Sequence, residues 1–144
     1  MKVSIVITRY NEPNDWFMSS LNSLSEQRCL NARVYVLDQM KEDKIKLFCK
    51  NISNKNIKFI YIQIPKSSLS EAKNYGILKS KEDIVLFFEP DMIAEKQWAK
   101  NIVLKLSKND DIAIACSKIV PLWESKPNLL VKSCISCIVF VPSL

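Results

Sequence analysis

Two carboxylates, Glu89 and Asp91, stand one residue apart directly after the apolar run Ile84–Phe88. A short apolar run of this composition is typical of a buried strand in a parallel sheet. Ligands of open α/β sheets bind beyond the carboxyl ends of the strands. Two carboxylates at such an edge are costly unless a positive group lies beside them, and a divalent cation that carries a phosphate would meet that need.

Three further polar segments fall where a site at this edge would be built. One follows the first expected strand, one follows the second, and one lies in the helix after the third: residues 8–12, 38–39 and 70–76. Each segment alone is weak, because polar residues after a strand usually form a turn or a helix cap. Their joint order along the chain is a much stronger indication of a site.

Strand and helix patterns alternate along the chain. Apolar runs predict strands at residues 3–7, 34–37 and 84–88, and later strands at 112–116, 118–122 and 134–141. Alternating apolar and polar residues predict a strand at 57–64. Helical spacing predicts helices over 13–27, 41–52, 68–78 and 94–106. In the second helix Ile45, Leu47 and Phe48 should face the core, and Ser68 with Glu71 should form a capping box at the start of the third. The alternation predicts an α/β fold with a mainly parallel sheet and helices on both faces.

Length and composition are ordinary for one soluble domain, which we expect to cover residues 1–144. The net charge of +6 comes mainly from lysines without a dense block, and no basic stripe interleaved with aromatics predicts a nucleic-acid partner. The apolar start is too short for a signal peptide, and no apolar run is long enough to span a membrane. We therefore expect a cytoplasmic protein, which could also sit at the inner face of the membrane.

Several kinds of chemistry are excluded by residues that the chain lacks. It has no histidine, so imidazole bases and catalytic triads are absent. Its one glycine, Gly76, excludes a P-loop and a dinucleotide fingerprint. Five cysteines without a scaffold pattern indicate buried thiols in a reducing compartment. A nucleotide bound here would therefore need a metal held by acids rather than a glycine loop.

In order and spacing, the four polar segments together resemble the family 2 glycosyltransferases of the GT-A fold. The family's opening strand and turn are matched by residues 3–12, and its second strand with a terminal aspartate by 36–39. Its next helix is matched by 69–77 and its acidic metal motif by 89–91. The resemblance covers about the first 110 residues. It implies a Rossmann-like GT-A domain that is C-terminally truncated, with the acceptor half largely missing.

The resemblance implies a metal-dependent, inverting transfer of a sugar from a nucleoside diphosphate sugar, with a UDP sugar as the expected donor and Mn²⁺ or Mg²⁺ as the cofactor. Asp91 is then the ligand of the metal that bridges the two phosphates. Glu89 would support the donor sugar or an outer-shell water. Taken alone, Asp91 would also fit a helix N-cap.

The resemblance also implies a nucleotide-binding set, made up of Thr8, Tyr10, Glu12, Asp38, Gln39 and Lys73. Tyr10 offers a flat face to a pyrimidine, and Asp38 or Gln39 can hydrogen-bond the edge of the base. Glu12 would hold the ribose side of the cleft. Lys73 would meet a phosphate or hold its helix against the acids. Tyr10 as a packed aromatic and Asp38 as a helix cap are the ordinary alternatives.

The chain departs from the family pattern in ways that leave a second function open. Gln39 stands where the family often has another aspartate, and Glu89 begins a motif that is often all aspartate. The acceptor half, with its general base, is expected to lie outside this chain, so the catalytic residues are unknown. The alternative is a truncated, non-catalytic nucleotide-sugar-binding domain that acts with a partner chain or a second copy of itself. A nucleotidyltransferase is a third, weaker possibility, because those enzymes usually carry a glycine-rich phosphate loop.

Overall fold

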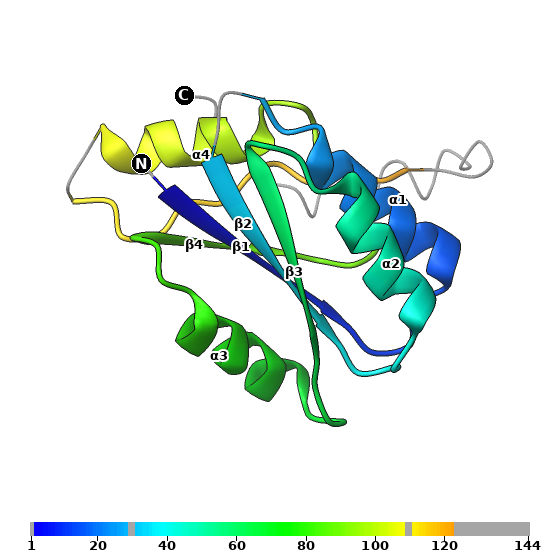
Figure 1. The fold of residues 1–144 in the computed structure, drawn as a ribbon. Helices are drawn as coiled ribbons and strands as arrows, with labels where there is room; N and C mark the ends of the chain where they lie inside the picture. The colour runs from blue at the N-terminus through cyan, green and yellow to red at the C-terminus, as the bar shows by residue number, and fades with distance from the viewer. Residues whose placement is uncertain (1, 29–30, 109–110, 123–144) are drawn as a thin grey trace, which may run out of the picture.

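The chain forms the alternating strands and helices that its sequence predicts (Figure 1). The computed structural model describes residues 2–28, 31–108 and 111–122. In these ranges the elements are β1 (Lys2–Arg9), α1 (Asn14–Ser25), β2 (Asn31–Asp38), α2 (Asp43–Ile52), β3 (Ile57–Gln63), α3 (Leu69–Lys79), β4 (Ile84–Phe88) and α4 (Trp98–Ser107). None of the helices in this described part of the chain is long and apolar enough to cross a membrane.

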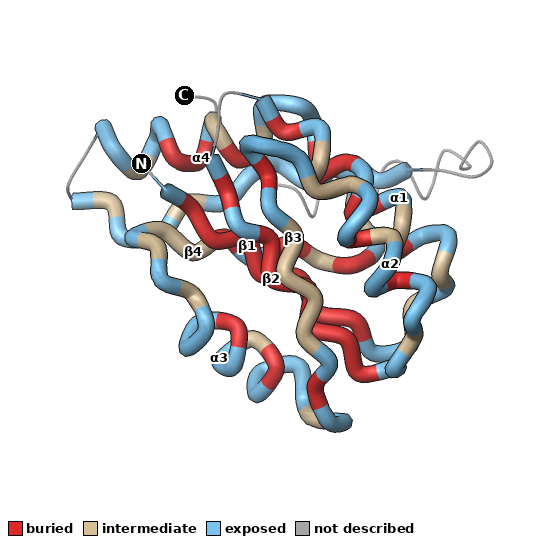
Figure 2. The backbone as a smooth tube through the Cα atoms, in the orientation of Figure 1, coloured by how far each residue is buried: buried red, intermediate tan, exposed pale blue. Residues whose placement is uncertain are grey.

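The four strands form one parallel sheet in the order β3-β2-β1-β4. Figure 1 shows α1, α2 and α4 on one face of the sheet and α3 on the other. The central strand β1 is buried from Val3 to Arg9, and Figure 2 shows the buried backbone concentrated in the middle of the sheet. The predicted α/β architecture, with helices on both faces, is therefore confirmed.

Side chains that alternate along the strands fill a separate core on each face of the sheet. Val3, Ile5 and Ile7 of β1 belong to the larger cluster, with α1, α2 and α4. Val6 belongs to the smaller cluster, with Ala72 of α3. The predicted capping box forms at the start of α3, which fixes where this helix begins below the sheet.

Three predictions of local structure are wrong. The apolar runs at 112–116 and 118–122 form no strand, and Ile114 among them is 88% exposed. In α2, Leu47 is 59% exposed, and buried Cys49 takes the inward position one turn after Ile45. The last helix begins at Trp98 instead of residue 94. The strand predicted at 134–141 lies outside the described residues.

Candidate functional site

The carboxyl ends of β1, β2 and β4 meet at one edge of the sheet, as the polar segments predict. Arg9 at the end of β1 pairs with Asp38 at the end of β2. On the other side of β1, Ile7 pairs with Phe88, the residue before Glu89. The segments after these three strands therefore emerge together, although they are far apart in the sequence.

The acidic pair lies on a tight turn directly after β4. The Met92 N–H donates to the Glu89 carbonyl at 3.3 Å, and Pro90 takes the second position of the turn, which proline favours. Asp91 is exposed at the tip of this turn. The N-cap residue of α4 is Gln97. Asp91 is therefore not the N-cap of this helix, which was the alternative role that its position in the sequence suggested.

Buried serines of α1 hold this turn in place. Ser20 Oγ donates to the Pro90 carbonyl at 2.7 Å, and Ser23 Oγ accepts from the Ala94 N–H at 3.0 Å. Both contacts join residues about 70 positions apart in the sequence. Asp91 is thereby presented to solvent from a fixed backbone.

Lys73 of α3 supplies the positive group that the acidic pair requires. Its Nζ lies 2.5 Å from Glu89 Oε1, in a half-buried ion pair, and 5.8 Å from the centre of the Phe87 ring. This contact matches the predicted role of Lys73 in holding its helix against the acids. The predicted contact with a phosphate is compatible with it, because an ammonium group has three donors.

A metal bound at this turn would take most of its coordinating atoms from water and from a bound phosphate compound, because the protein offers few. In the described ranges no three His, Cys, Asp or Glu side chains lie together as a metal cluster. Mg²⁺ is usually bound through one or two carboxylates, several waters and the phosphates of its substrate. The exposed carboxylate of Asp91 fits a metal of that kind, which would arrive with a diphosphate.

Asp38 lies at the predicted edge but is fully buried, at 0% exposure. Its Oδ1 accepts from the Met40 N–H and its Oδ2 from the Tyr61 hydroxyl, both at 2.9 Å. Burial and this hydrogen bond raise the pKa of Tyr61 far above its ordinary value, so the hydroxyl remains a donor. The cap residue of α2 is Glu42, so Asp38 is not a helix cap.

Arg9 is the residue of this site that the sequence reasoning did not identify. It is 1% exposed, and its guanidinium lies 3.5 Å from Asp38, 3.4 Å from Glu42 and 5.4 Å from the centre of the Phe17 ring. Its Nη2 also donates to Asn14 Oδ1 at 2.5 Å. An arginine at the end of a strand that was expected to be buried is the signal that could have revealed it, because a buried charge needs partners.

The loop after β1 is shaped by Glu12. Its Oε2 accepts from the backbone N–H groups of Tyr10 and Asn11, at 2.8 and 3.1 Å. Tyr10 is 55% exposed, so it is not a packed core aromatic and its ring is free to meet a ligand. Thr8, in contrast, is buried within β1.

Gln39 is one of the residues that line an open hollow of about 530 Å³. The lining residues are Gln39, Met40, Lys41, Ile64, Pro65 and Lys66, which follow the carboxyl ends of β2 and β3. Gln39 is 6% exposed, and its Oε1 accepts from the Ser67 N–H at 2.8 Å. This hollow is large enough for a base or a sugar.

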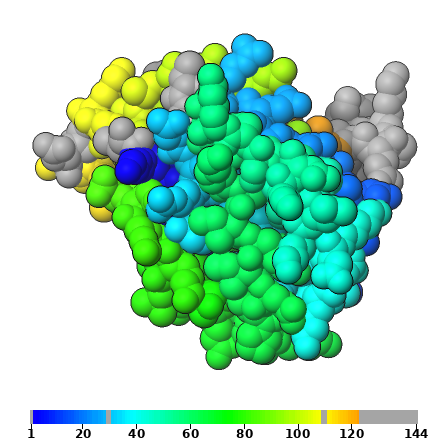
Figure 3. All heavy atoms as spheres, in the orientation of Figure 1, coloured from blue at the N-terminus to red at the C-terminus, as the bar shows by residue number. Residues whose placement is uncertain are grey.

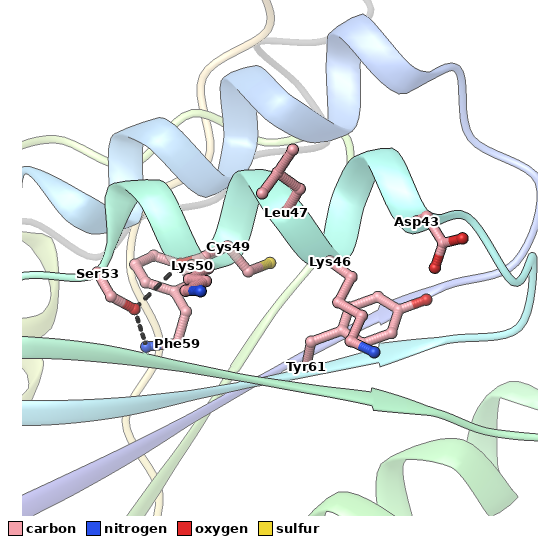
Figure 4. Close-up of a pocket in the computed structure, with 8 residues that line it drawn as sticks. All are labelled: Asp43, Lys46, Leu47, Cys49, Lys50, Ser53, Phe59 and Tyr61. Atoms are coloured by element: carbon pink, nitrogen blue, oxygen red, sulfur yellow. Dashed lines mark hydrogen bonds between the residues drawn. The ribbon is translucent and has the colours of Figure 1, made fainter.

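A second hollow, of about 410 Å³, lies between α2 and β3 (Figure 4). Figure 3 shows this face of the molecule, where the residues of α2 and β3 lie side by side on the surface. Burial and the nearby Asp38 charge raise the pKa of the Cys49 thiol to about 12, so it is a poor nucleophile. Ser53 Oγ is used in holding α2 to β3, since it donates to the Cys49 carbonyl and accepts from the Phe59 N–H. The hollow at Gln39 is therefore the better candidate for a site.

Comparisons with known proteins agree with this arrangement. Residues 4–132 match the family described as Glycosyl transferase family 2. The chain is 25% identical over 114 residues to Glycosyltransferase GlyA of Streptococcus pneumoniae, which covers 78% of this chain and 16% of GlyA.

Solved structures give the same result for the fold. S. aureus TarS 1-349 matches with a TM-score of 0.61 and 21% identity, over 75% of this chain and 33% of that one. The structure of the same protein in complex with UDP-GlcNAc matches with a TM-score of 0.61 and 21% identity, over 75% of this chain and 32% of the TarS chain. The likeness shows the GT-A fold, and the chain spans about a third or less of each of these relatives.

Proposed function

The chain belongs to glycosyl transferase family 2, and on that premise we propose that it binds the nucleoside diphosphate sugar donor of a glycosyl transfer reaction. We propose a UDP sugar as this donor. The proposal is supported by S. aureus TarS, which has this fold and whose structures include complexes with UDP-GlcNAc and UDP. Residues 1–144 would act as one donor-binding domain.

One observation carries the proposal: the parallel sheet brings Tyr10, Gln39 and the acidic turn to one edge. An exposed aromatic face, a hollow and a carboxylate turn are what a base, a sugar and a metal-bound diphosphate require. Tyr10 would stack on the base. Asp91 would hold the metal on the diphosphate, with Glu89 beside the donor sugar.

The remaining residues of the predicted nucleotide-binding set would contact the ligand or shape the site around it. Glu12 would reach the ribose through Oε1, because its Oε2 is used by the loop. Lys73 would stand beside the phosphates while it holds Glu89. Buried Thr8 and Asp38 would shape the floor and the edge of the site.

The proposed chemistry is an inverting transfer that depends on Mn²⁺ or Mg²⁺. When bound, the cation supplies positive charge to the departing nucleoside diphosphate. Asp91 would hold that cation, and Lys73, paired with Glu89, would place an ammonium group at the same acidic turn. None of the described residues is proposed as the general base.

Calorimetric titration of the purified chain with UDP, with and without Mn²⁺, tests this proposal. We expect binding that requires the metal and is lost in Asp91→Asn, which keeps the size of the side chain and removes its charge. Asp83→Asn is the matched control. Asp83 is exposed at the opposite end of β4, so this variant should bind UDP like the parent.

Two results would contradict the proposal. A folded parent chain, as judged by circular dichroism, that binds no UDP with Mn²⁺ would rule out a working donor site. Binding that survives in Asp91→Asn would show that the metal assignment is wrong.

A further inference from the structure

Arg9 joins the two loops that follow β1 and β2, residues 10–13 and 39–42. Its Nη2 donates to the Glu12 carbonyl at 3.3 Å and to Asn14 Oδ1 at 2.5 Å, at the end of the β1–α1 loop. The same nitrogen donates to Glu42 Oε1 at 3.4 Å, at the end of the β2–α2 loop. One buried side chain therefore contacts both loops where they enter α1 and α2.

The proposed contacts with the nucleoside come from these two loops. Tyr10 and Glu12 lie on the β1–α1 loop, while Gln39 begins the β2–α2 loop, which supplies three of the residues that line the hollow. The acidic turn is held by other contacts, from buried serines of α1 and from Lys73. In the described part of the chain, no hydrogen bond or ion pair of Arg9 reaches that turn.

The β2–α2 loop has a conformation that needs to be held. Lys41 has a φ of 59°, in the left-handed region that residues other than glycine rarely adopt. Before it, the Met40 N–H donates to Asp38 Oδ1, and Asp38 lies 3.5 Å from Arg9. After it, the Glu42 carboxylate accepts from Arg9. The contacts on both sides of the strained residue therefore lead to the same guanidinium.

Stability alone is a poor explanation for Arg9. Its Nε and Nη1 are buried and make no hydrogen bond within the part of the chain that the structure describes. A buried donor without a partner is unfavourable, and a buried ion pair can often be replaced by apolar residues without loss of stability. Since β1 is buried from Val3 onward, an apolar side chain would suit its end. The contacts with the two loops are the better reason for a guanidinium here.

We propose that Arg9 is a positioning residue, which holds the two loops in the arrangement that binds the nucleoside and so sets Tyr10 in place before the ligand arrives. Loops that are already ordered lose little freedom on binding, so the affinity is higher. The guanidinium acts through the loops and does not touch the ligand, because it is buried. The inference rests on the proposed function, since it assigns a role within the same site.

The substitution Arg9→Lys tests this role. Lysine keeps the buried positive charge, but its single ammonium group lacks the planar fork that contacts both loops. We expect the affinity for UDP with Mn²⁺ to fall by about threefold to tenfold. In the parent chain Tyr10→Ala should weaken binding by at least about fivefold, whereas in Arg9→Lys the same change should weaken it by less than about twofold.

A change that only lowered the stability of the fold would not give this result, because effects at independent sites add. Circular dichroism at the temperature of the titration shows that each variant is folded. Arg33→Lys is the matched control, since Arg33 pairs with Glu82 at the other end of the strands. This variant should keep the parent's affinity for UDP and the full effect of Tyr10→Ala. The requirement for Mn²⁺ should persist in Arg9→Lys.

Asn14→Ala is a milder variant, which decides the question if Arg9→Lys does not fold. It removes one contact of Arg9 with the β1–α1 loop and leaves the ion pairs with Asp38 and Glu42 in place. We expect it to reduce the effect of Tyr10→Ala by at least about twofold.

Hydrogen exchange measured by mass spectrometry tests the loops without a ligand. In Arg9→Lys the backbone of residues 10–13 and 39–42 should exchange faster than in the parent, because weaker contacts allow local opening. In Asn14→Ala only residues 10–13 should exchange faster. Residues 89–92 should be unchanged in both variants.

The outcomes separate this inference from the proposed function. A folded parent chain that binds no UDP with Mn²⁺ would contradict both. UDP binding that requires Mn²⁺ and Asp91, with the full effect of Tyr10→Ala retained in Arg9→Lys, would overturn only the role of Arg9. Hydrogen exchange of the two loops that is the same in Arg9→Lys as in the parent would also overturn it.

Discussion

Arg9 places a buried guanidinium at the end of the central strand, where it lies against Asp38 and Glu42. A paired charge of this kind contributes modestly to stability, but removing one partner typically costs about 3–5 kcal/mol. The same side chain donates to Asn14 and to the Glu12 carbonyl, so it also holds the loop that carries Tyr10. The loop that carries exposed Tyr10 is thus held by a buried ionic network.

Tyr10 is the exposed aromatic that this network presents. In Tyr10→Ala we expect the affinity for UDP to fall by on the order of 1–3 kcal/mol, the scale for a base that stacks on an aromatic side chain. The matched variant Tyr10→Phe keeps the ring and should bind within about twofold of the parent. Calorimetry on both variants measures the effect, and an unchanged affinity in Tyr10→Ala would place the ring outside the site.

The sequence predicted that these polar residues would lie at one edge of the sheet, but it could not predict which of them are buried. Strand ends marked by Glu89 and Asp91, Asp38 and Tyr10 meet at one edge because parallel strands share the direction of their carboxyl ends. The role of Arg9 could not be predicted, because it depends on contacts with α1 and with the start of α2, which no local sequence pattern reveals. The Ser67 contact that orients Gln39 likewise joins segments 28 residues apart.

At the scale of elements, local patterns succeeded where each element carries its own signal. The four strands of the sheet are marked by apolar runs or by alternating apolar and polar residues, and α3 has its capping box. The runs at 112–116 and 118–122 misled because an apolar β-branched run becomes a strand only beside another strand. The predicted start of α4 was wrong because Gln27, in the loop after α1, accepts from the Ala99 N–H and donates to the Glu95 carbonyl, and these contacts hold residues 94–97 outside the helix.

Gly76 allows α3 to approach β1 closely, and this contact can be tested. A Cβ at this position would lie 2.4 Å from Val6 Cγ1 and 3.2 Å from Leu37 Cδ1. We expect Gly76→Ala to lower the free energy of unfolding, because overpacking costs about 1–3 kcal/mol and the gain in helix propensity is at most about 1 kcal/mol.

Urea unfolding measures the change in Gly76→Ala. Asn74→Ala, at an exposed position of the same helix, gains propensity without a clash and should be neutral or slightly stabilised. If Gly76→Ala were as stable as Asn74→Ala, the close approach of α3 to Val6 would not constrain the fold.

At the scale of the whole molecule, the two ends of the parallel strands carry different kinds of groups. The carboxyl edge carries the exposed acidic turn and the hollow at Gln39. At the opposite edge the nearly covered carboxylate of Glu82 accepts from Ser4 Oγ and pairs with Arg33 at 2.7 Å. Since Ser4 lies on β1, Arg33 on β2 and Glu82 just before β4, this cluster ties together three of the four strands far from the proposed ligand.

The Glu82 cluster should therefore affect stability without affecting ligand binding. Burial alone would raise the pKa of Glu82, but hydrogen bonds from Ser4 and the Lys81 N–H, with the Arg33 charge, lower it below its ordinary 4.5. A carboxylate with a lowered pKa stabilises the fold above the pKa of the unfolded chain, and this stabilisation is lost as the pH falls through the folded value. The free energy of unfolding of the parent should thus decrease as the pH drops below about 4.5.

In Glu82→Gln this part of the pH dependence should disappear. At pH 7 the variant should be less stable by about 1–3 kcal/mol, because Arg33 and Ser4 lose a charged acceptor. Urea unfolding between pH 7 and pH 3.5 measures both effects, and calorimetry with UDP should give an unchanged affinity at pH 7. Asp91→Asn should behave in the opposite way, losing UDP binding while its stability stays close to that of the parent. If the Glu82→Gln variant were fully folded but bound UDP more weakly, the two ends of the sheet would be energetically coupled. The Glu82 cluster would then affect ligand binding as well as stability, contrary to this prediction.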